Sequence, residues 1–161
     1  MNLRRLAFMA LLTAVATLLS PLISIPAAGA KAFPVQHAVN VICGVLLGPG
    51  PAVTVAFAVA LLRNLLGTGT PLAFPGGMVG AFLAGHFYKM TGKTLAAGIG
   101  EVIGTGLIGA TLAYPVAKVL LGKSVAAFTY VVPFSLSSLA GAVAGVVVVQ
   151  PLLRKGIARD L

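Results

Sequence analysis

The sequence predicts an all-α membrane protein, with six transmembrane helices in a single integral membrane domain over residues 1–161. Hydrophobic residues make up 59% of the chain and charged residues only 8%, and the mean hydropathy is +1.09. A soluble domain carries about 25% charged residues, so this chain cannot cover a water-facing surface. That excludes a soluble enzyme, a nucleic-acid-binding domain and a disordered chain. Six helices of about 20 residues occupy roughly 120 residues, which leaves room only for loops.

The first helix is expected over residues 6–25. Arg4 and Arg5 precede its apolar run, and small residues follow at 27–30, a combination that imitates a cleavable secretory signal. We favour an uncleaved transmembrane helix because residues 6–30 carry no charge and are long enough to cross the bilayer. The apolar segments that follow also offer this helix partners to pack against.

Proline, glycine and cationic residues divide the rest of the chain. The sequence Gly-Pro-Gly-Pro at 48–51 predicts a tight turn after a short second helix, and the Gly- and Pro-rich stretch 67–77 predicts irregular backbone. Pro115 predicts a bend in the fifth helix. The five remaining helices are expected at 34–47, 52–66, 78–90, 95–121 and 130–153.

The distribution of cations predicts the orientation. Six helices with both termini on one side place seven Lys or Arg residues on that side and about four on the other. Cytoplasmic loops are enriched in Lys and Arg, so both termini are expected in the cytoplasm and the protein in the cell membrane. The seven are Arg4, Arg5, Lys89, Lys93, Arg154, Lys155 and Arg159, and the four are Lys31, Arg63, Lys118 and Lys123.

Glu101 is the only acidic residue before Asp160, and it lies inside the expected fifth helix. An intramembrane carboxylate needs a partner or a function. Arg63, near the end of the third helix, is a candidate for a structural ion pair with it. A role for Glu101 in ligand binding is compatible with that pair, and Thr105, four residues on, shares its helix face.

A second polar group opens the second helix. Gln36, His37 and Asn40 are spaced so that all three side chains can point into one cavity. Amide and imidazole groups both donate and accept hydrogen bonds, which suits a neutral small molecule better than an ion. Hydrogen bonding between helices remains the alternative.

A third polar group surrounds the irregular stretch. Asn64 precedes the sequence Gly-Thr-Gly-Thr, which contains Thr68 and Thr70. Irregular backbone at membrane depth is tolerated where it lines a cavity or is buried in protein. Phe74, just beyond, and Phe33 are candidates for walls that stack on a flat ring. The stretch is not a P-loop, because it lacks the Gly-Lys-Ser/Thr ending.

The sequence offers no further catalytic or metal-binding pattern. Cys43 is the single cysteine, which excludes an intrachain disulfide and a Cys-based zinc site. The sequence has no carboxylate pair and no His-x-x-x-His motif. We therefore expect no enzyme activity, no cofactor and no metal.

Small residues at four-residue spacing predict close helix packing. Ala10 and Ala14 form such a pair on the first helix. Glycine pairs on the later helices are expected to pack within the chain; they are Gly76 with Gly80, Gly100 with Gly104, and Gly141 with Gly145.

Taken together, these segments resemble the substrate-binding S components of energy-coupling factor (ECF) vitamin transporters, and more specifically the ThiW type, associated with the thiazole precursor of thiamine. The length, the six expected helices, the cytoplasmic termini and Ala10-x-x-x-Ala14 are shared features. The more specific segments are Phe33-Pro34-Val35-Gln36-His37, Arg63-Asn64-x-x-Gly67-Thr68-Gly69-Thr70, Ala73-Phe74-Pro75-Gly76 and Gly100-Glu101-x-x-Gly104-Thr105-Gly106.

The resemblance implies a protein that binds substrate on the outer side of the membrane. It implies association with a transmembrane coupling protein and two cytoplasmic ATPase subunits, with Ala10 and Ala14 meeting the coupling protein. It also implies toppling in the membrane to carry substrate inward. The expected ligand is hydroxyethylthiazole, a small, flat, neutral molecule.

The hydroxyl or ring nitrogen of that ligand is expected to meet Glu101 or His37, within a group that also includes Gln36 and Asn64. The segment 26–34 is expected to act as a lid. The open alternatives are an S component for thiamine or another small vitamin, a stand-alone small-solute facilitator or channel, and a membrane enzyme using Glu101 and His37.

Overall fold

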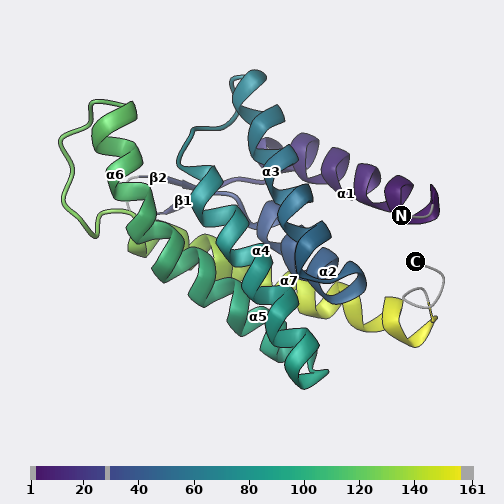
Figure 1. Cartoon of the computed structure of the whole chain (residues 1–161). Coiled ribbons are helices and arrows are strands. Elements are labelled where there is room, and N and C mark those ends of the chain that lie inside the picture. The colour runs from purple at the N-terminus through teal and green to yellow at the C-terminus, as the bar shows by residue number, and fades with distance from the viewer. Residues whose placement is uncertain (1–2, 28–29, 157–161) are drawn as a thin grey trace.

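In residues 3–27 and 30–156, which the computed structural model describes, the apolar stretches form helices (Figure 1). Three consecutive elements, α5, η1 and α6, continue one another as one rod, so the described chain contains six helical rods. The elements are α1 (Leu3–Leu22), α2 (Pro34–Leu47), α3 (Pro49–Leu65), α4 (Ala73–Thr91), α5 (Thr94–Glu101), η1 (Val102–Gly109), α6 (Ala110–Leu120) and α7 (Val131–Arg154).

One element lies outside the all-α prediction. Strands β1 (Ile25–Ala27) and β2 (Ala30–Ala32) pair antiparallel, with Ile25 opposite Ala32. The hairpin follows the end of α1, where Pro26 cannot continue a helical hydrogen-bond ladder, and it packs against α7. Residues 28 and 29, within the segment expected to act as a lid, lie outside the described residues.

Three helical segments are long and apolar enough to cross a membrane: α1, the rod Thr94–Leu120 and α7. The helices α2 and α3 are apolar but shorter. With a rise of about 1.5 Å per residue, the 14 residues of α2 span less than the ~30 Å hydrocarbon core. The length criterion therefore supports three of the six expected transmembrane helices.

Two helices begin earlier than expected. α3 starts at Pro49 and α4 at Ala73, so the second half of the stretch expected to be irregular is helical. The prolines responsible lie in the first turn of each helix, where no intrahelical N–H partner is lost. Between α2 and α3, Gly48 has a φ of 88°, which glycine adopts without steric cost.

The stretch Val102–Gly109 is a π-helix, which the sequence did not predict. The π-helix has i→i+5 hydrogen bonds and is found mostly as short insertions at functional sites. It begins directly after Glu101 and contains Thr105.

Glycines bring α4 against η1 backbone to backbone. A Cβ on Gly104 would lie 2.6 Å from Cα of Gly80, and one on Gly109 would lie 2.4 Å from Cα of Gly76. The predicted packing of glycine pairs within the chain is confirmed here. On α7, Gly141 serves the same purpose against α2, since its Cβ would lie 2.5 Å from Cβ of His37.

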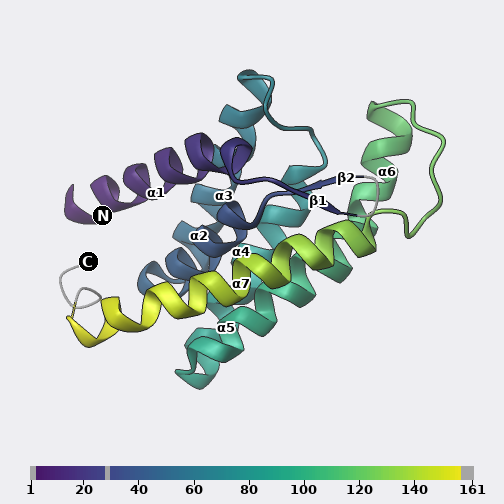
Figure 2. The same cartoon turned by 180° about the vertical axis from the view of Figure 1, so that it is seen from behind.

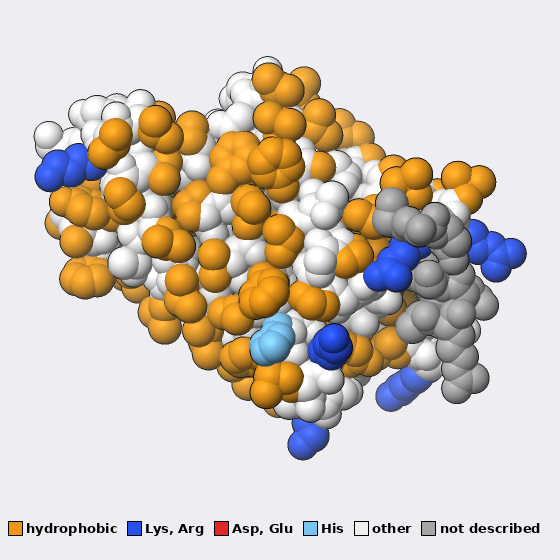
Figure 3. All heavy atoms as spheres, in the orientation of Figure 1, with side chains coloured by type: hydrophobic (Ala, Val, Ile, Leu, Met, Phe, Trp, Pro, Cys, Tyr) orange, Lys and Arg blue, Asp and Glu red, His pale blue; other side chains and the backbone are white. Residues whose placement is uncertain are grey.

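The two ends of the bundle differ. α1 begins and α7 ends at the same end, whereas the hairpin and the connection from α6 to α7 lie toward the other (Figures 1 and 2). On the face drawn in Figure 3, apolar side chains cover the middle and most Lys and Arg side chains gather toward the end where α1 begins. This division matches the charge asymmetry seen in the sequence.

Candidate functional site

The carboxylate of Glu101 is fully buried between α2, α4 and η1. Its Oε1 accepts hydrogen bonds from Asn40 Nδ2 at 3.2 Å and Thr105 Oγ1 at 2.8 Å, and it lies 2.7 Å from His37 Nδ1. With the carboxylate ionised, Nδ1 of His37 carries the hydrogen of this bond. Three donors on one oxygen compensate for much of the cost of burying the charge. We call Gln36, His37, Asn40, Glu101 and Thr105 the carboxylate cluster.

Arg63 joins this cluster from the other side. Its Nη1 donates to Gln36 Oε1 at 2.5 Å, and Gln36 Nε2 lies 3.2 Å from His37 Nε2. In this series of hydrogen bonds each group can donate to the next, from the guanidinium of Arg63 to the amide of Gln36, the imidazole of His37 and the carboxylate of Glu101. Arg63 and Glu101, expected as a candidate ion pair, are therefore joined through Gln36 and His37 rather than in direct contact. Among the described residues, the ion-pair geometry at Glu101 is with His37.

Arg63 also organises the surrounding backbone. Its guanidinium lies 4.2 Å from the centre of the Phe33 ring, and its Nη2 donates to the carbonyl of Thr68 at 2.8 Å. A cation over an aromatic face is a favourable contact. Arg63 thus links the α3–α4 loop to the residue that precedes α2.

The other polar residues at the end of α3 and in the loop after it lie away from the carboxylate. Asn64 Nδ2 donates to the carbonyls of Ala60 at 2.7 Å and Thr70 at 3.1 Å. Thr68 and Thr70 are exposed. Asn64, expected to converge with Gln36, His37 and Glu101, is instead engaged by this backbone. We call Asn64, Thr68 and Thr70 the loop group.

A small cavity of about 40 Å³ lies between the hairpin, α2, α4, η1 and α7. Its polar lining comes from Gln36, His37 and Thr105 of the carboxylate cluster, together with Lys31 and Ser137. Its aromatic lining comes from Phe33 and Phe134. The remaining lining residues are Ala73, Gly76, Gly77 and Pro133.

Several expected site residues stand back from this cavity. Phe74, expected as a wall, packs against Phe57 with ring centres 5.6 Å apart. Glu101 and Asn40 do not line the cavity either. Because His37 and Thr105 both contact Glu101 and line the cavity, the carboxylate orients side chains that face the cavity.

Lys31, Phe134 and Ser137 are lining residues that the sequence analysis did not select. Ser137 Oγ accepts a hydrogen bond from the backbone N–H of Phe33 at 2.8 Å, which ties α7 to the residue before α2. A cluster of serines at 135, 137 and 138 on an otherwise apolar helix was the available signal for Ser137. Lys31 and Phe134 carried no comparable signal.

The second carboxylate oxygen, Oε2 of Glu101, is buried without a hydrogen-bond partner. It lies beside Gly80, where a Cβ would come within 2.6 Å of it and 2.1 Å of Thr105 Oγ1. The absence of a side chain at position 80 is therefore a requirement of the carboxylate cluster.

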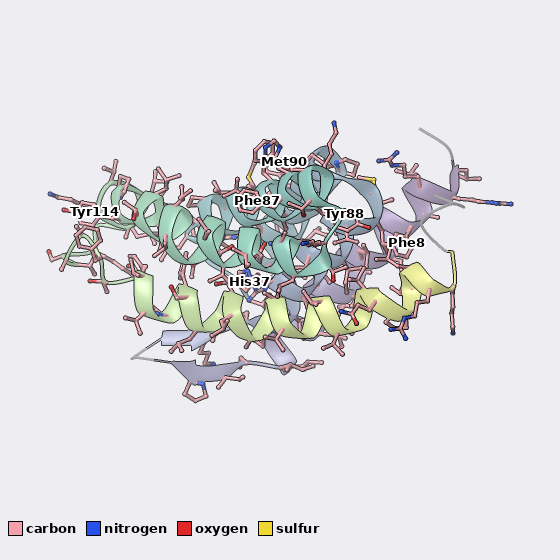
Figure 4. All side chains as sticks on the ribbon, turned by 90° about the horizontal axis from the view of Figure 1, so that it is seen from below. Phe8, His37, Phe87, Tyr88, Met90 and Tyr114 are labelled. Carbon is pink, nitrogen blue, oxygen red and sulfur yellow. The ribbon has the colours of Figure 1, made fainter. Side chains whose placement is uncertain are left out.

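The cluster lies deep in the bundle. Figure 4 shows His37 in the interior, between the two ends that Tyr114 and Phe8 mark. Among the described residues, no three His, Cys, Asp or Glu side chains are grouped so as to hold a metal ion. The donors and acceptors of the site suit hydrogen bonding to a small molecule.

Apolar helices around a small polar cavity are typical of membrane-embedded proteins that bind small molecules. Residues 6–155 match the family described as thiamine-precursor transporter protein (ThiW), and the chain belongs to this family. No curated protein and no solved structure matches the chain. The chain is thus a transporter-family protein with membrane helices and not an enzyme.

Proposed function

We propose that this protein is the substrate-binding membrane component of an ECF-type importer. In this proposal it binds hydroxyethylthiazole, the thiazole moiety of thiamine, for ATP-driven uptake by partner subunits. The observation that carries the proposal is the cavity itself, which two aromatic rings line together with the polar side chains of Gln36, His37, Thr105 and Ser137. Membership of the thiamine-precursor transporter family supports the ligand class.

The chemistry of the lining suits this ligand. Phe33 and Phe134 offer apolar walls for a flat ring, and His37, Gln36 and Ser137 offer hydrogen bonds to one hydroxyl and one ring nitrogen. Within the proposal, His37 is the contact to the hydroxyl or ring nitrogen, and Glu101 holds its imidazole at 2.7 Å. Asn40 acts in the same indirect way.

Binding requires the lining side chains to move apart. Each water molecule needs roughly 10–15 Å³ of cavity volume. The cavity of about 40 Å³ therefore accommodates only a few waters. A substituted thiazole ring is larger than this. Lys31 is exposed and has a long, flexible side chain, so it can withdraw at low cost.

The partners in this proposal are a transmembrane coupling protein and two cytoplasmic ATPase subunits. Ala10 and Ala14 are exposed on α1, and small side chains let another helix approach closely. The cation count supports a cytoplasmic position for both termini. The cavity, which borders the hairpin toward the opposite end of the bundle, then faces the outer side.

The ligand is tested by calorimetric titration of the purified full-length protein in detergent. The titrants are hydroxyethylthiazole, thiamine and the pyrimidine half of thiamine. The proposal expects saturable binding with the thiazole as the tightest ligand. Tightest binding of thiamine would instead favour an S component for the finished vitamin.

The coupling to ATPase subunits needs a separate test. Cells expressing the protein with a coupling protein and its ATPases are compared with cells in which the ATPases are inactivated. We expect uptake of labelled thiazole only with active ATPases. Equal uptake in both would support the stand-alone facilitator and reject the importer.

A further inference from the structure

One cation lines the cavity, a second lies behind its wall, and no carboxylate is among the lining residues. Lys31 on β2 is one of its lining residues. Arg63 stands directly behind the wall, with its guanidinium over the Phe33 ring and hydrogen-bonded to Gln36. Both Phe33 and Gln36 line the cavity.

The carboxylate nearest the cavity does not face it. Glu101 is the only acidic residue in the described part of the chain, and three donors occupy its Oε1. It does not line the cavity, and His37 and Thr105 stand between the carboxylate and the space. A cationic ligand would therefore meet Lys31 without an anion in contact to offset the repulsion.

Phe33, one of the two aromatic residues that line the cavity, does not compensate for this repulsion. A cation is attracted to the face of an aromatic ring, but Arg63 already occupies one face of Phe33 at 4.2 Å. A second cation against that ring would lie close to both Arg63 and Lys31. Like charges brought together in this way are a means of rejecting an unwanted ligand.

This arrangement distinguishes the precursor from the vitamin. The thiazole precursor is neutral, whereas in thiamine the ring nitrogen is alkylated and the ring is a cationic thiazolium. We propose that Lys31 is a specificity-determining residue, whose ammonium group makes the cavity select a neutral thiazole over a thiazolium. The inference rests on the proposed function, because it concerns the same ligand site.

The test compares two ligands of nearly the same shape. Hydroxyethylthiazole and its N-methyl thiazolium are titrated into the wild-type protein and into Lys31→Gln, Lys31→Glu and the control Lys123→Gln. Lys123 is exposed and lies outside this cavity. N-methylation also removes the ring acceptor, so the change in the affinity ratio between variants isolates the effect of charge.

We expect the wild type to prefer the neutral ligand and Lys31→Gln to reduce that preference by about tenfold, since the ammonium group repels a nearby like charge. Lys31→Glu should reduce the preference further and Lys123→Gln should leave it unchanged. The wild-type preference should also fall as salt is raised, because Lys31 is exposed and its field is screened.

Each failure has its own signature. If both Lys31 variants bind the neutral thiazole yet keep the wild-type ratio, the role of Lys31 is wrong and the proposed function stands. Equally tight binding of the two ligands to the wild type also rejects it. If the wild type binds no thiazole, the proposed function fails and this inference fails with it. Thermal unfolding of each variant verifies that it is folded.

Discussion

The carboxylate cluster and the loop group look alike in the sequence and differ in the structure. Both consist of neutral polar side chains beside one charged residue, and both were candidates for the same site. The polar groups on α2 and on the α5–η1 rod face one another and converge on Glu101. Asn64 instead bonds the carbonyls of Ala60 on its own helix and of Thr70 in the loop that follows.

The difference follows from the backbone around each group. In a helix the carbonyl and N–H groups are already paired, so polar side chains are free to bond across to other helices. In the α3–α4 loop the backbone is only partly paired in this way, and the side chains of Arg63 and Asn64 donate to the carbonyls of Thr68 and Thr70. Polar residues next to irregular backbone are therefore weaker candidates for ligand contacts than those on regular helices.

The largest expected effect separates the two groups by stability. Glu101→Ala leaves three donors without their acceptor and should lower the free energy of unfolding by about 3–5 kcal/mol, as for a broken buried charge pair. Asn64→Ala removes hydrogen bonds to the carbonyls of Ala60 and Thr70 and should cost about 1 kcal/mol. Denaturation of the purified proteins with SDS measures both. Equal losses would contradict the distinction.

A glycine pair on α4 tests the same cluster sterically. In Gly80→Ala the new Cβ would meet Thr105 Oγ1 at 2.1 Å, and the expected cost is about 1–3 kcal/mol from overpacking. Gly77→Ala is the matched control, because its Cβ would meet only Ala56 Cβ at 3.9 Å. That control should be neutral or slightly stabilising, since alanine favours a helix over glycine. A neutral Gly80→Ala would show that the cluster tolerates a side chain there.

Ligand binding extends the comparison from stability to function. His37→Ala should weaken binding of hydroxyethylthiazole by about tenfold, or 1.4 kcal/mol, because His37 lines the cavity. Asn64→Ala should change the affinity less than twofold, since Asn64 bonds the carbonyls of Ala60 and Thr70 and does not line the cavity. Calorimetric titration of folded protein provides the measurement. A larger loss of affinity in Asn64→Ala than in His37→Ala would indicate that the loop group contacts the ligand.

The smallest expected effect concerns the two candidate ring partners. Phe134 lines the cavity, whereas Phe74 packs on Phe57. Phe134→Leu should weaken thiazole binding by about 0.5–1.5 kcal/mol, the scale of an aromatic contact, while Phe74→Leu should leave the affinity unchanged. The same titration measures both variants, and the reverse order of effects would make Phe74 the wall.

The fold was largely predictable because hydropathy and proline positions determine where helices form in such a chain. The segment expected at 34–47 is α2 within the same bounds, and the rod expected at 95–121 runs over Thr94–Leu120. The hairpin and the π-helix were not predicted. Each depends on contacts with distant segments, α7 for β1 and β2 and α4 for η1, which local patterns do not contain.

The site was predictable in part for a related reason. The spacing of Gln36, His37 and Asn40, and of Glu101 and Thr105, places each set on one helix face, and the structure brings the two sets together. Which residues line the cavity depends on how α7 and the hairpin lie against these helices. Tertiary packing brings Lys31 and Phe134 there without any sequence pattern, and the serine cluster on α7 was the one signal for Ser137.

Where α4 contacts η1, the wall of the cavity has no side chains between the two backbones that could rearrange. Where glycine backbones touch at 76, 80, 104 and 109, there are no side-chain rotamers to rearrange, and a shift of one helix must carry the other with it. Room for an incoming molecule is therefore created on the facing wall, where Lys31, Phe33 and Phe134 lie. Entry and selectivity are then controlled by the same few side chains.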